Sequence, residues 1–197
     1  NTDFDDHREF AGRVFLLPFK KTDLAALRGL GFGVGGSWGD FSTTNTSGLP
    51  NGNGYITDGQ QQFFAYNPAG ATVVADGEHW RLAPQGYYYF GPFGLLGEYT
   101  ISNQRVRRNL APFESVRLNN TGWQVAASWV LTGEDAAFNG VAPRQAFDPR
   151  NGKWGAFQVV ARYAELDIDD DAFPLFSNPL TSAAAAQSWS AGLNWYL

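Results

Sequence analysis

The 197-residue sequence lacks cysteine and methionine entirely and contains only two histidines. Without cysteine, the chain forms no disulfide framework, no thiolate zinc site and no cysteine nucleophile. Charged residues are also scarce, at 17%, whereas a soluble domain carries about a quarter. The net charge of −5 is opposite to the basic footprint of a nucleic-acid-binding protein. We therefore expect no nucleic-acid partner.

Long apolar runs are missing too. The longest, residues 14–19, is interrupted by Pro18 and is far shorter than the roughly 20 residues of a membrane-spanning helix. This pattern excludes a helical membrane protein. The chain opens at Asn1 without an initiator methionine or a signal peptide, and we expect it to be a piece of a longer protein.

Aromatic residues and glycine are abundant, and apolar residues recur at every second position, which is the period of a β-strand. In the last segment, for example, Trp189, Leu193 and Trp195 share one face, while Ser190 and Asn194 share the other. The opposing face is built mainly from Ser, Gly, Gln, Asn and Thr. The expected strands cover residues 8–17, 30–38, 79–90, 94–104, 122–132, 154–166 and 186–197.

Strands of this length suit a tilted membrane crossing, with one face toward lipid and the other toward water in a lumen. The predicted fold class is therefore all-β, a transmembrane antiparallel β-barrel. A soluble β-sandwich also alternates, but it would cover its outer surface with Lys and Glu. A carbohydrate-binding sandwich, with Trp and Tyr as sugar platforms, remains the soluble alternative.

The connections differ in length. Gly91 and Pro92 form a two-residue turn, whereas residues 39–78, 105–120 and 167–185 are long and polar, as expected of external loops. Strand directions alternate consistently only if residues 60–66 are not a crossing but part of a long external loop that could fold into the lumen. Residues 133–153 then form an unusually long periplasmic connection.

Seven strands cannot close an even-numbered bacterial barrel, and an open edge in lipid leaves backbone groups unpaired. We therefore expect residues 1–197 to be one partial outer-membrane barrel domain, with upstream strands and a final hairpin missing.

Five segments in order carry a family resemblance: residues 12–19, 91–99, 131–135, 155–163 and 192–197. They read Gly-Arg-Val-Phe with a following Pro-Phe, Gly-Pro-Phe-Gly-Leu-Leu-Gly-Glu-Tyr, Leu-Thr-Gly-Glu-Asp, Gly-Ala-Phe-Gln-Val-Val-Ala-Arg-Tyr and Gly-Leu-Asn-Trp-Tyr-Leu. Together they resemble the C-terminal half of the phosphate-selective porin O and P family. The resemblance implies a 16-stranded bacterial outer-membrane barrel, a homotrimer in contact with membrane lipid and lipopolysaccharide, that conducts small anions such as phosphate.

Four charged residues fall on the predicted lumen face: Arg13, Arg81 and Arg162, with Glu98 opposing them. Because a charge facing lipid near the midplane costs about 2–4 kcal/mol, we expect these residues to line the pore. Rings of charge there would set ion preference. With Glu9 as a second opposing carboxylate, the balance of charge on this face is only slightly positive, so phosphate specificity is not carried over from the resemblance.

We expect no enzyme activity, cofactor or metal. Residues 31–36 match G-x-G-x-x-G and residues 35–39 match G-x-S-x-G, but neither stands at a strand-to-helix turn. We interpret the glycines as making room for an inserted loop. Residues 167–171 are acidic, and a solvated external loop explains them better than a Ca²⁺ site. The predicted function is passive diffusion through a porin; the alternative within the same fold is a plugged barrel serving as a structural subunit of an envelope assembly.

Overall fold

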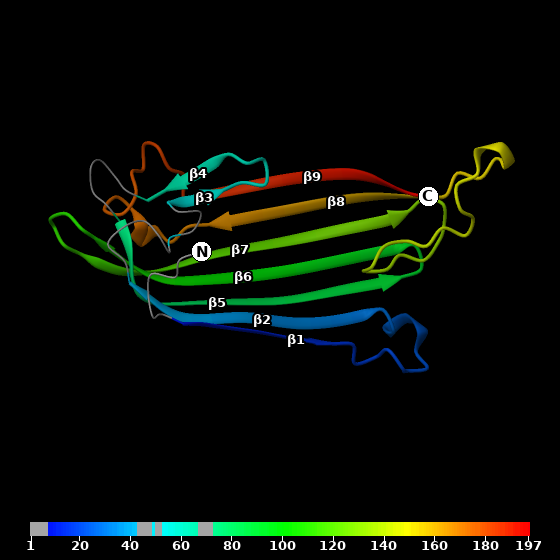
Figure 1. The fold of residues 1–197 in the computed structure, drawn as a ribbon, viewed down its shortest axis with the longest axis horizontal. Helices are drawn as coiled ribbons and strands as arrows, with labels where there is room; N and C mark the ends of the chain where they lie inside the picture. The colour runs from blue at the N-terminus through cyan, green and yellow to red at the C-terminus, as the bar shows by residue number, and fades with distance from the viewer. Residues whose placement is uncertain (1–7, 43–48, 50–52, 67–72) are drawn as a thin grey trace.

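The computed structural model describes residues 8–42, 49, 53–66 and 73–197. Its main feature is a seven-stranded sheet in which every neighbouring pair is antiparallel (Figure 1). The strand order is β1-β2-β5-β6-β7-β8-β9, so each long strand pairs with the next long strand along the chain. The bounds are β1 Glu9–Leu16, β2 Leu30–Ser42, β5 Val73–Phe90, β6 Phe93–Arg108, β7 Ser115–Val130, β8 Ala156–Asp167 and β9 Ala185–Tyr196.

All seven predicted strands are present, and the all-β prediction is confirmed. The tight turn is also where it was expected: Phe90 pairs with Phe93, and Gly91 adopts a positive φ of 54° between them. We call the end of the strands at which this turn lies the turn end of the sheet. It also holds residues 17–29, with the short 3-10 helix η1 (Ala25–Leu27), and residues 131–155, with η3 (Pro149–Asn151).

At the opposite end of the strands, which we call the loop end, the strands are longer than predicted. Residues 39–42, 73–78, 105–108 and 115–120 were expected to be loop but continue the strands. Charged pairs between strands support this extension: Arg107 Nε of β6 lies 3.2 Å from Asp76 Oδ1 of the adjacent β5, and an Arg117 nitrogen of β7 lies 2.9 Å from Glu78 Oε2 of β5, across β6. Strand pairing needs only backbone partners, so it continues here although the apolar residues of these segments, such as Val106 and Leu118, lie on the opposite face of the sheet from those in its middle. Parts of the predicted 39–78 loop, residues 43–48, 50–52 and 67–72, lie outside the described residues.

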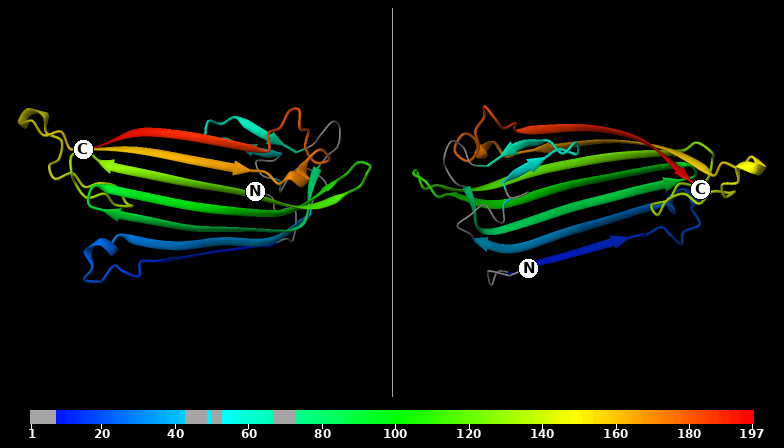
Figure 2. Two further views of the ribbon diagram at one scale, coloured as in Figure 1. Left: turned by 180° about the vertical axis from the view of Figure 1, so that it is seen from behind. Right: turned by 45° about the horizontal axis from the view of Figure 1, so that its top comes forward.

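A small second sheet lies against the loop ends of β8 and β9 (Figures 1 and 2). It is the hairpin of β3 (Gly54–Ile56) and β4 (Gln62–Ala65). The prediction that residues 60–66 form no separate crossing is confirmed. Phe64 and Tyr66 of this segment are buried with residues from the ends of β5, β6 and β7 and from residues 168–177, which include η4 (Asp170–Ala172). The cluster comprises Leu49, Phe64, Tyr66, Val73, Ala75, Val106, Leu118, Ile168, Ala172 and Phe176.

Apolar side chains are buried mainly at the two ends of the sheet. A second, smaller cluster at the turn end contains Val130, Ala136, Val141 and Ala156. The 131–155 connection is held there by a hydrogen bond from the Ala136 amide to the Gly91 carbonyl, 2.7 Å long. Between these clusters, only the tip of the β3–β4 hairpin reaches the middle of the sheet among the described residues, and no second sheet covers it. This is not the architecture of a β-sandwich, in which two sheets pack face to face.

The sheet is open in this chain, because β1 and β9 each pair on one side only. Barrel closure and a total of 16 strands therefore remain predictions. Within the described part of the chain, no helix is long and apolar enough to cross a membrane.

Candidate functional site

The two faces of the large sheet have opposite chemistry. On one face, which we call the apolar face, large aliphatic side chains from six strands are more than a third exposed. An apolar surface of this extent marks a membrane or protein contact and not a surface that faces water. The aliphatic residues in its middle are Val34, Leu82, Leu95, Val125, Val159 and Leu193.

Aromatic rings border this aliphatic middle at two levels. Five strands each carry two apolar-face rings six residues apart, which is about 20 Å along a strand. The rings contact one another across strands: Phe93 stacks on Trp129 at 5.9 Å, and Tyr163 lies 4.5 Å from Trp189. Such paired girdles flank the lipid-facing band of transmembrane barrels. The pairs are Phe32/Trp38, Phe93/Tyr99, Trp129/Trp123, Phe157/Tyr163 and Trp195/Trp189, with the turn-end ring given first.

The four predicted site residues all lie on the other face, the polar face. Strand register places Arg13 beside Gly35, Arg81 beside Ser37, and Glu98 and Arg162 on either side of β7. Their pore-lining role is not tested by this placement. Arg13 donates to the Gln85 side chain at 2.6 Å, and Arg81 lies 3.8 Å from a Glu9 carboxylate oxygen. These two arginines therefore occupy the β1–β2–β5 part of the face, apart from Glu98 and Arg162.

At the turn end, the polar face carries aromatic rings that lie over glycines. A Cβ on Gly33 would meet the Phe15 ring well inside van der Waals contact, and one on Gly31 would lie 2.8 Å from the Tyr87 ring. Phe15 stacks on Tyr87 at 5.2 Å, and Tyr87 stacks on Phe138 of the 131–155 connection at 5.2 Å. The expectation that the glycines make room for an inserted loop is wrong at Gly31 and Gly33, where they make room for rings of the sheet itself.

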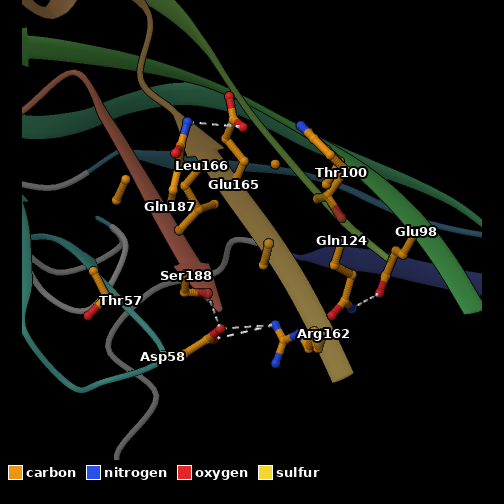
Figure 3. Close-up of a pocket in the computed structure, with 14 residues that line it drawn as sticks. Thr57, Asp58, Glu98, Thr100, Gln124, Arg162, Glu165, Leu166, Gln187 and Ser188 are labelled. Carbon is orange, nitrogen blue, oxygen red and sulfur yellow. Dashed lines mark hydrogen bonds and ion pairs between the residues drawn. The ribbon is translucent and has the colours of Figure 1, made fainter. Parts of the chain in front are cut away.

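Glu98 and Arg162 come together at one cavity of about 250 Å³ on the polar face (Figure 3). Its floor is formed by β6, β7, β8 and β9, and the tip of the β3–β4 hairpin forms its wall. From this tip, Asp58 places its carboxylate 3.4 Å from an Arg162 nitrogen and accepts a 2.7 Å hydrogen bond from the Ser188 hydroxyl. A loop segment thus contacts the sheet directly at a residue predicted to line the pore.

The rest of the cavity offers both donors and acceptors of hydrogen bonds. Gln124 donates to the Glu98 carboxylate at 2.8 Å, and the lining includes Thr57 and Thr100. The ionisable side chains that line this cavity on the polar face are Arg162, Asp58 and Glu98, which carry one positive and two negative charges. Such a site has no cluster of cations for a multiply charged anion, but it has many hydrogen-bonding partners for a hydrated or hydroxyl-bearing solute.

The hairpin that carries Asp58 is fixed to the polar face by specific contacts. The Tyr55 hydroxyl accepts a 2.9 Å hydrogen bond from Asn120 of β7, and the Ala183 amide donates to the Phe63 carbonyl at 2.8 Å. Burial raises the pKa of the Tyr55 hydroxyl above its ordinary value, which favours the neutral form that makes this hydrogen bond. Asp58 is therefore positioned by a packed element.

Sequence reasoning missed Asp58, Gln124 and Ser188. Asp58-Gly59 between two short apolar segments is a recognisable hairpin signal, and it could have placed Asp58 at a turn. Nothing local could have indicated its partner, because Arg162 is 104 residues away. The acidic stretch 167–171 has a structural role at Asp169, which accepts from the Asn119 and Asp171 amides at 2.8 and 3.0 Å. Among the described residues, no group of three or more potential metal ligands occurs.

A sheet with one exposed apolar face bordered by aromatic rings, and one polar face with a lined cavity, is what one wall of a porin requires. The family profile described as phosphate-selective porin O and P matches residues 17–197. The chain therefore belongs to the phosphate-selective porin O and P family, a family of outer-membrane porins. A search of curated proteins found no match. Family membership supports a porin channel in general.

Proposed function

We propose that this chain forms part of the wall of an outer-membrane barrel through which small hydrophilic solutes, among them anions such as phosphate, diffuse passively. The observation that carries the proposal is the division of a single sheet into a lipid-compatible face and a polar face. The solutes would move along the polar face, past Arg13, Arg81 and the cavity at Arg162. Further strands would close the barrel, and homotrimers in contact with lipopolysaccharide would be its assembled state.

Anions are favoured only weakly in this proposal. Apart from Arg108, which is buried at the loop end, the arginines of the polar face are Arg13, Arg81 and Arg162. Glu9, Glu98 and Asp58 oppose them within the described residues. Charges along a water-filled path set which ions enter, and a nearly balanced set gives a small preference. The description of the family supports phosphate as one of the solutes.

The proposal is tested by single-channel recording of the full-length protein in a planar bilayer, first under a KCl gradient and then with phosphate added. We expect discrete conductance steps, a reversal potential that slightly favours chloride, and a decrease of this preference in Arg81→Ala. Arg105→Ala is the matched control, because Arg105 lies on the opposite side of the sheet and pairs with Asp76 at 3.5 Å.

Two other outcomes of this recording would change the interpretation. Folded protein that gives no conductance would contradict the proposal and favour the plugged, structural barrel; the 131–155 connection and the β3–β4 hairpin already lie over opposite ends of the polar face. Conductance without any response to Arg81→Ala would retain the pore and remove Arg81 from the path.

A further inference from the structure

Asp58 belongs to the hairpin tip and yet is held against the sheet by two contacts. Its carboxylate lies 3.4 Å from an Arg162 nitrogen, and the hydroxyl of Ser188 on β9 donates to it at 2.7 Å. Asp58 and Arg162 are each about 40% exposed at the side chain, so both remain accessible from the cavity (Figure 3). The ion pair is thus part of the surface that a solute in the cavity would touch.

The pair changes what Arg162 offers to a passing ion. An isolated guanidinium on a polar pore wall attracts anions and offers a planar set of donors that fits phosphate. With a carboxylate at 3.4 Å, its field is largely cancelled over longer distances, and some of its donors are already directed at Asp58. Glu98 lines the same cavity and adds a second negative charge.

The position of Asp58 is a property of the fold. Phe64 and Tyr66, which follow the tip, are almost completely buried, and Phe64 packs edge-on against Tyr66 at 4.9 Å. At the other side of the tip, Tyr55 is bonded to Asn120 of the sheet. Gln60 in the turn adopts a positive φ of 62°, which directs the chain back toward β4. The tip therefore stays close to Arg162.

We propose that Asp58 is a selectivity-determining residue of this channel. By pairing with Arg162, it makes the cavity a site for uncharged, hydroxyl-bearing solutes and lowers the selectivity of the path for phosphate-like anions. The inference rests on the proposed function, since it assumes that solutes pass along the polar face. The side chains that would contact such a solute are Thr57, Thr100, Gln124, Ser188 and the Asp58–Arg162 pair.

The test is Asp58→Asn in the full-length protein, which retains the size of the side chain and removes its charge. We expect the anion-to-cation permeability ratio in a KCl gradient to rise by about threefold or more, because charges in a cleft change local ion concentrations by roughly 10-fold and upward. Inorganic phosphate should block the variant at lower concentration than the wild type. Asp148→Asn, at the turn end and away from the cavity, should leave both quantities unchanged.

Two further variants test whether the effect of Asp58→Asn on selectivity depends on its pairing with Arg162. In Asp58→Asn/Arg162→Ala, the gain in anion selectivity should disappear, because the guanidinium released by the first change is gone. Ser188→Ala keeps every charge and removes one tether of Asp58, so it should shift selectivity in the same direction by less. Folding of each variant is checked by its heat-dependent migration on detergent gels.

The two proposals fail differently. If the folded wild-type protein gives no conductance, both the porin function and the role of Asp58 are overturned. If the wild type conducts but neither Asp58→Asn nor Ser188→Ala shifts the reversal potential, the role of Asp58 alone is overturned. If Asp58→Asn does not fold, the result for Ser188→Ala decides.

Discussion

The apolar and the polar face of the large sheet are made by the same strands, one residue apart, and yet they meet different surroundings. On the apolar face, aliphatic side chains are exposed, no described segment covers them, and aromatic rings border them at both levels. On the polar face, charged and amide side chains find partners, and loop segments from both ends fold over the sheet. In the proposed barrel one face would meet lipid and the other water, so the alternation would separate two solvents and not the inside of a soluble core from its outside.

The largest expected effect comes from placing a charge on the wrong face. Val125 lies in the middle of the apolar face, whereas its neighbour Gln124 lies on the polar face beside Glu98. Val125→Arg should destabilise the membrane-inserted protein by about 2–4 kcal/mol, because an arginine near the bilayer midplane loses its hydration. The measurement is the urea dependence of folding into lipid vesicles.

Gln124→Arg is the matched control, one residue along the same strand, and it should fold nearly as well as the wild type. Equal tolerance of arginine at both positions would show that the apolar face does not meet lipid. The comparison between the two faces would then lose its physical basis.

The contrast between the two faces could be predicted from the sequence, because successive residues of a β-strand point to opposite faces of the sheet. Arg13, Arg81, Glu98 and Arg162 were assigned to the polar face from alternation alone, and strand register confirms that they share that face. The positions at which the strands end were harder to predict. Beyond the aromatic rings the apolar residues change face: Val106 and Leu118 are buried on the polar-face side, so the pattern seen in the middle of the strands is not continued, while the backbone pairing continues to Arg108.

The contact at the hairpin tip could not have been predicted in the same way. The sequence indicates a turn at Asp58-Gly59, but the partners of that turn depend on how a long connection folds back over the sheet. Asp58 and Ser188 are 130 residues apart, and no local pattern joins them. The charge balance of the cavity, on which selectivity depends, therefore emerged only from the three-dimensional arrangement.

A smaller loss of stability is expected from a substitution on the polar face at the turn end, where an aromatic ring lies over a glycine. Gly33→Ala should destabilise the protein by about 1–3 kcal/mol, because the added Cβ overpacks against the Phe15 ring, which is itself stacked on Tyr87. Gly35→Ala, two residues along the same face, is the control: its Cβ would meet nothing closer than 3.9 Å. Urea titration in vesicles measures both.

The double variant Gly33→Ala/Phe15→Ala tests the reason for this effect. If the ring is what the new Cβ meets, the two changes should be non-additive and the double variant should be less unstable than the sum of the single ones. Additive losses would mean that the glycine is needed for some other property of the strand.

The smallest expected effect concerns the cover of the polar face at the turn end. Phe138, on the 131–155 connection, is 57% exposed and contacts the sheet by stacking on Tyr87 at an interplanar angle of 19°. Phe138→Ala should cost about 1 kcal/mol, the scale of one aromatic pair at a partly exposed site. Phe113→Ala is the control, because Phe113 is 74% exposed in the 109–114 loop. If both variants unfold at the same urea concentration as the wild type, the stack on Tyr87 does not hold the connection, and the polar face at this end would be open to solutes.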